Sequence, residues 1–184
     1  MNFTYTAQPT GTNIVSLADM KLFLRVDHTD EDATITAIID AATQSIQDYT
    51  GRHFKTTTWL LTCRDFNDLE VPYSANTVTG ISYYEENNNT PITLNTSKYY
   101  SGIELGIMKI IFRDTPTADP YRIGAVNVIG SVANQINPPL THAIKMLAAH
   151  YFENRRAVVV GTITAVIPFG IKAIINPYRL ISLK

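Results

Sequence analysis

Two consecutive amphipathic helices, predicted over residues 16–52, constrain this chain more than any other feature. Ser16 is a favourable N-cap for the first helix, and Asp19 stands three residues later in the capping-box position. The helix is expected to break at residues 25–29, where the apolar spacing is lost. Its apolar stripe consists of Leu17, Met20, Phe23 and Leu24.

The second helix is predicted to begin with Thr29 or Asp30 as its cap and to end at Gly51. Glu31 and Asp32 fall in its first turn, where each carboxylate stabilises the positive end of the helix dipole by roughly 0.3–1 kcal/mol. Neither helix can bury its stripe alone, so each must pack on the other and on a later partner. The stripe of the second helix consists of Ile35, Ile38, Ile39, Ala42, Ile46 and Tyr49.

Composition narrows the class of protein. With 184 residues, of which 45% are hydrophobic and 17% charged, the chain can form one sizeable core, or a core plus a small inserted sheet. The net charge of −1 gives no basic field for nucleic acid or for an anionic membrane. The single cysteine, Cys63, allows no intrachain disulfide and is typical of a cytosolic protein. No stretch approaches the roughly 20 apolar residues that cross a bilayer, so we expect no membrane contact.

The middle of the chain changes from helical to alternating periodicity. Short strands are predicted over residues 56–65, 78–84, 92–94, 98–100, 107–112 and 125–132, with a bulge at Gly80 and a turn over residues 86–91. Because the strands are short and separated by turns, the sheet is expected to be antiparallel. Residues 1–13 form either an extended contact arm or a disordered tail.

A third helix is predicted from Pro138 to about Arg155, and a short fourth helix from Pro168 to Pro177. The stripe of the third helix is the expected partner of the second helix and consists of Leu140, Ile144, Leu147, Ala148, Tyr151 and Phe152. The predicted fold class is therefore α+β: a small bundle of three main helices plus a short C-terminal helix, with an antiparallel β insertion between helices 2 and 3. We expect a single domain over residues 1–184, made of an arm (1–14), helices 1 and 2 (15–52), the insertion (53–134) and the C-terminal helices with an apolar link (138–184).

Several of these segments resemble the head–tail connector (adaptor, or head-completion) proteins of tailed phages. The run VSLADMKLFLRVDH (residues 15–28) is similar to their first helix, and residues 30–52 are similar to their second helix and its exit. The run AIKMLAAHYFENR (143–155) resembles their third helix, and PFGIKAIINPYR (168–179) resembles their closing segment. The last strand departs from the family pattern, because VIGS (128–131) stands where the family often has a tyrosine-containing turn.

The resemblance implies a structural virion protein of the phage neck, assembled in the host cytoplasm and located at the head–tail junction. It implies a cyclic head-to-tail ring of roughly twelve copies, a dodecamer. The implied partners are the portal protein, a tail-completion or stopper protein, and packaged DNA that passes through the lumen without specific binding. The alternative is a small binding module or enzyme that uses the β insertion as a ligand cleft.

Candidate chemistry in the sequence is weak. His150 and Glu153 share a helix face but lack a third ligand or a nucleophile, and the acidic residues 30–32 are explained by their place in a helix first turn. We therefore expect no catalytic residue, no metal ligand and no cofactor, and a protein that is not an enzyme.

The apolar link, residues 157–167, is the strongest candidate for a contact surface. It joins two helices yet is apolar and rich in β-branched residues, so it forms either a buried core strand or a surface that a partner covers on assembly. As an assembly surface it would be extended and would add to the sheet edge of a neighbour. The predicted assembly and partner contacts are Arg155, Arg156, Val158, Val159, Val160, Ile163, Tyr178 and Arg179.

Overall fold

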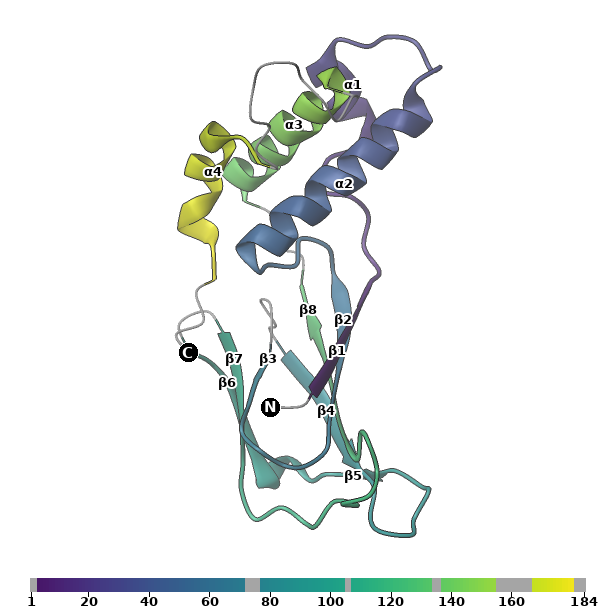
Figure 1. The fold of residues 1–184 in the computed structure, drawn as a ribbon, viewed down its shortest axis with the longest axis vertical. Helices are drawn as coiled ribbons and strands as arrows, with labels where there is room; N and C mark the ends of the chain where they lie inside the picture. Colours follow the sequence, from purple (N-terminus) through teal and green to yellow (C-terminus); the bar gives the residue numbers. More distant parts are fainter. Residues whose placement is uncertain (1–2, 72–76, 105–106, 134–136, 155–166, 181–184) are drawn as a thin grey trace. The chain divides into compact units, whose positions relative to one another are not determined.

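The described part of the chain consists of two compact units, each with its own apolar core. The computed structural model describes residues 3–71, 77–104, 107–133, 137–154 and 167–180. Unit 1 comprises Met1–Gly11, Lys55–Asn134 and Ser182–Lys184, and unit 2 comprises Thr12–Phe54 and Gln135–Ile181. Strands make up unit 1 and helices make up unit 2 (Figure 1), so the predicted α+β class is confirmed.

The helices of unit 2 begin and end close to the predicted positions. They are α1 (Leu17–Leu24), α2 (Asp32–Thr50), α3 (Pro138–Glu153) and α4 (Phe169–Ile175), followed by the 3-10 turn η2 (Asn176–Tyr178). None of the helices in the described residues is long and apolar enough to span a membrane.

The start of α1 is capped as predicted. The Ser16 hydroxyl oxygen accepts a hydrogen bond from the Asp19 amide at 3.0 Å and donates to the Asp19 carboxylate at 2.8 Å. Arg25, with φ of 58°, ends the helix in the left-handed conformation. The start of this helix therefore follows from its local sequence.

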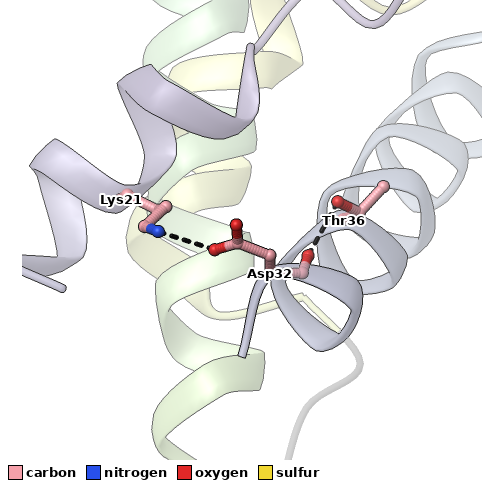
Figure 2. Close-up of polar contacts among 3 residues, drawn as sticks. All are labelled: Lys21, Asp32 and Thr36. Atoms are coloured by element: carbon pink, nitrogen blue, oxygen red, sulfur yellow. Dashed lines mark hydrogen bonds and ion pairs between the residues drawn. The ribbon is translucent and has the colours of Figure 1, made fainter. Parts of the chain in front are cut away.

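The start of α2 differs from the prediction. Glu31, rather than Thr29 or Asp30, occupies the cap position, and no side chain caps the helix by a hydrogen bond. Asp32 is the first helical residue, and its carboxylate lies 2.6 Å from the Lys21 ammonium on α1 (Figure 2). The Thr36 hydroxyl donates to the Asp32 carbonyl at 2.8 Å, one turn further along the helix. The acidic first turn thus joins α1 to α2 in addition to balancing the helix dipole.

The predicted stripes of α2 and α3 meet in the core of unit 2. The two helices pack on each other, and α3 also contacts α1 and α4. Thr43 and Thr50 are buried on α2, where their hydroxyls donate to the Ile39 and Ile46 carbonyls, each at 2.7 Å. The fully buried apolar side chains of this core include Met20, Ile35, Ile39, Ile46, Phe54, Leu140, Ile144 and Leu147.

Unit 1 contains two antiparallel sheets. The five-stranded sheet has the order β1-β2-β8-β4-β5, and the three-stranded sheet has the order β3-β7-β6 (Figure 1). The strands of the first sheet are β1 (Phe3–Pro9), β2 (Thr57–Cys63), β4 (Thr77–Tyr83), β5 (Ile92–Thr93) and β8 (Val126–Val132). Those of the second sheet are β3 (Leu69–Val71), β6 (Tyr99–Glu104) and β7 (Ile107–Phe112), with the 3-10 turn η1 (Thr96–Lys98) before β6.

The buried faces of the two sheets share one apolar cluster. Trp59 and Leu61 of β2 and Ile81 of β4 contribute from the larger sheet, and Val71 and Ile110 contribute from the smaller one. The predicted bulge is confirmed, because the register between β4 and β8 shifts between Val78 and Gly80. Because successive side chains of a strand point to opposite faces of its sheet, alternate residues of each strand lie on the outer faces of the two sheets.

Two strands were not predicted. Residues 3–9 of the expected arm form β1, whose Phe3 pairs with Cys63 of β2, so the larger sheet also includes the N-terminal segment. The three-residue β3 pairs with β7. The predicted strand over residues 98–100 is instead the end of η1 followed by the longer strand β6.

Candidate assembly surfaces

The predicted contact residues fall in two segments. Arg155, Arg156, Val158, Val159, Val160 and Ile163 lie outside the described residues, and their role stays a prediction. Tyr178 and Arg179 are described and lie at the end of η2.

The segment around Tyr178 is anchored to the C-terminal end of α2. The Arg52 side chain donates through Nε to the Tyr178 carbonyl at 2.6 Å, and the Leu180 amide donates to the Thr50 carbonyl at 2.8 Å. Burial lowers the pKa of the Arg52 guanidinium from its ordinary value. Gly51, with φ of 68°, lets the chain turn away at this point. The Tyr178 backbone therefore has a structural role within unit 2.

Arg179 lies beside the aromatic ring of Tyr49 on α2. Its guanidinium carbon is 5.3 Å from the centre of the Tyr49 ring, and the Lys172 ammonium is 5.9 Å from that centre. The Tyr49 hydroxyl donates to the Asn176 side-chain oxygen at 2.6 Å. The exposed Arg179 side chain thus remains accessible to a partner while its position is restricted by a cation–π contact.

Exposed apolar side chains on the helices form candidate contacts that the sequence reasoning missed. Leu22 of α1 is 80% exposed and Phe169 of α4 is 87% exposed. Phe23 was predicted to belong to the buried stripe, but it is 41% exposed and meets the His142 ring edge-on at 6.2 Å. The run Leu22-Phe23-Leu24 carried the signal, because three consecutive residues cannot all face the same side of a helix.

Unit 1 presents a second set of exposed apolar side chains. Tyr121 and Ile123 are 83% and 87% exposed on the loop before β8. Two contacts connect this loop to Tyr84: the Asp119 amide donates to the Tyr84 carbonyl at 2.8 Å, and the Arg122 guanidinium lies 3.4 Å from the centre of the Tyr84 ring. A third group, on the smaller sheet, consists of Tyr100, Ile103 and Ile111.

The candidate chemical groups are explained by structural contacts. His150 Nδ1 lies 3.2 Å from the Asn154 side-chain nitrogen, which also donates to the His150 carbonyl at 2.9 Å. Burial and the nearby Asp65 charge raise the pKa of Cys63 to about 11, so this thiol is protonated and unreactive at neutral pH. Within the described residues, no group of three or more histidine, cysteine, aspartate or glutamate side chains is placed to hold a metal ion.

Comparison with known proteins identifies a matching family. The model of the phage gp6-like head-tail connector protein family matches residues 14–111. No curated protein sequence matches at a significant level.

Among solved structures, a chain from the virion of a native gene transfer agent (GTA) particle has a TM-score of 0.75 and 20% identity. A chain from the neck of an empty GTA particle, computed with C6 symmetry, has a TM-score of 0.70 and 19% identity. A chain from the neck of a native GTA particle, computed with C12 symmetry, has a TM-score of 0.69 and 18% identity. Each alignment covers 100% of this chain and 98% of the other, so the whole fold is shared.

Proposed function

The chain belongs to the family of phage gp6-like head–tail connector proteins, and from this membership we propose that it forms a ring in the neck of a phage-like particle. It is a structural connector rather than an enzyme. The observation that carries the proposal is the family match over residues 14–111, which covers the two N-terminal helices and most of the strands. The fold shared with chains from GTA necks supports the same location.

The proposed ring is cyclic, with each subunit contacting the next through two different surfaces. We propose roughly twelve copies, because the necks of similar fold were computed with C6 and C12 symmetry. The ring would sit at the head–tail junction, between the portal protein and a tail-completion or stopper protein, after assembly in the host cytoplasm. Its architecture would be a single connector domain in which a small helical bundle carries the β insertion.

Packaged DNA would pass through this ring without being gripped. The net charge of −1 supports this, because affinity for duplex DNA comes mainly from lysine and arginine contacts with phosphates. We expect no submicromolar binding of duplex DNA by the isolated protein at physiological salt, measured by fluorescence anisotropy. Tight, salt-sensitive binding would contradict a passive lumen.

The proposed contact residues to the next subunit or the portal are Arg155, Arg156, Val158, Val159, Val160, Ile163, Tyr178 and Arg179. The uncharged β-branched character of the link supports this role. Replacing Val159 and Ile163 with serine should leave the melting temperature of the monomer unchanged and reduce incorporation into particles. If the double variant melts many degrees lower, the link belongs to the core and this part of the proposal fails.

Deletion and complementation test the proposed function. Without the protein, filled heads and complete tails should accumulate separately, and the wild-type chain supplied in trans should restore joined particles. Immunogold labelling of a tagged chain should mark the junction of each restored particle. Joined, infectious particles in the absence of the protein would show that it is not the connector.

A further inference from the structure

The two sheets of unit 1 have four outer strands within the described residues. The outer strands of the larger sheet are β1 and β5, and those of the smaller sheet are β3 and β6 (Figure 1). The outer side of an edge strand carries main-chain donors and acceptors that pair with any suitable strand. Proteins limit such pairing with very short edge strands, with charged side chains or with proline.

Two of the four edges are protected in this way. β5 has only two residues. β3 has three residues, and its middle residue, Glu70, lies 3.9 Å from the Lys109 ammonium of β7. Neither strand is long enough to hold a partner strand firmly.

The other two edges are long and almost uncharged. β1 has seven residues, none of them charged, and only its last residue, Pro9, lacks an amide. β6 has six residues, and its only charged residue, Glu104, stands at the end, where it pairs with Lys109 at 2.5 Å. An isolated monomer with two such edges would be prone to edge-to-edge association.

The side chains along these edges are accessible. Tyr100 and Ile103 of β6 are 60% and 57% exposed, and Ser101 between them is exposed as well. On β1 the exposed threonines Thr4 and Thr6 alternate with partly buried residues. A strand placed beside β6 would therefore gain main-chain hydrogen bonds and cover two apolar side chains.

We propose that β6 of one subunit pairs with β1 of the next subunit, so that the sheets of neighbouring copies join around the ring. The inference rests on the proposed ring, which needs two different complementary surfaces on each copy. The edges match this need, because they are unequal in sequence and nearly equal in length, at six and seven residues. Pairing of β6 with a second β6 would instead close a two-fold dimer and stop growth.

Site-directed cross-linking tests this pairing. Two copies with different affinity tags, one carrying Thr6→Cys and the other Ser101→Cys, are co-expressed, and the assembled particle is treated with a short bis-maleimide. The native Cys63 is buried and its pKa is raised to about 11, so the wild-type chain serves as the unreactive control. The matched control pair is Thr93→Cys with Ser101→Cys, because Thr93 is an exposed threonine on the short edge β5.

The proposal predicts a covalent dimer that carries both tags for the Thr6→Cys and Ser101→Cys pair and none for the control pair. Thr6→Lys should abolish the ring in mass photometry while its melting temperature stays that of the wild type, whereas Thr93→Lys should still form rings. Rings that form without the Thr6–Ser101 cross-link overturn the strand pairing and leave the connector function intact. Two other results would also overturn the pairing of β6 with β1. One is cross-linking of Ser101→Cys mainly to Ser101→Cys of another copy. The other is cross-linking of Ser101→Cys to a Thr162→Cys variant, which carries its cysteine in the apolar link of the neighbour. Assembled particles whose necks contain no ring of the wild-type chain would reject both the ring and this contact.

Discussion

Ile39→Ala tests whether the apolar stripe of α2 lies in the core of unit 2. Ile39 is 1% exposed and belongs to the cluster that α2 and α3 share. The change removes three buried carbon groups at about 0.8 kcal/mol each, or about 2.4 kcal/mol in transfer free energy. The cavity left behind raises the expected loss of stability to about 2–5 kcal/mol.

Urea unfolding followed by far-UV circular dichroism measures this loss, since the helices dominate that signal. With a denaturant dependence of roughly 2 kcal/mol per molar urea, the midpoint should fall by about 1–2.5 M. The matched control is Ile123→Ala, the same change at a residue that is 87% exposed, and it should alter stability by less than about 0.5 kcal/mol. Equal midpoints for the two variants would refute the placement of the stripe.

Three further changes have expected outcomes in the same assay. Asp32→Asn removes the partly buried ion pair with Lys21 and should cost about 1 kcal/mol, and a double-mutant cycle with Lys21→Met that shows no coupling would contradict this. Burial lowers the pKa of His53 in the folded chain below its ordinary value of about 6.5, so the unfolded chain binds this proton at a higher pH. The stability that neutral His53 contributes is therefore complete above about pH 6.5 and is lost as pH falls. His53→Gln should flatten this dependence of stability on pH. Gly130→Ala would place a methyl group against the Trp59 ring and the Thr77 carbonyl, closer than van der Waals contact allows, and should cost roughly 1–3 kcal/mol; unchanged stability would contradict this packing.

The helices could be predicted from sequence because their signals are local. The Ser16 cap, the Gly51 stop and the spacing of the stripes lie within a few residues of the elements that they define. The family resemblance also rested on these helical segments, and the family match over residues 14–111 confirms it.

The missed features depend on distant partners. β1 pairs with β2, which lies roughly fifty residues further along the chain. Its apolar residues Phe3, Tyr5 and Ala7 do alternate with polar ones, and this signal for a strand was missed because the segment was interpreted as an arm. β3 is too short to show a period. The anchoring of Tyr178 uses its main-chain carbonyl, which no side-chain pattern reveals, and the exposure of Leu22 and Phe23 depends on how α1 packs.

An electron cryomicroscopy reconstruction of the particle neck tests the central claim most directly. We expect a closed ring between portal and tail, with density in each subunit that fits the helices of unit 2 and the two sheets of unit 1. A neck whose density at this level is filled by another protein, with this chain absent from the purified particle, would contradict the account.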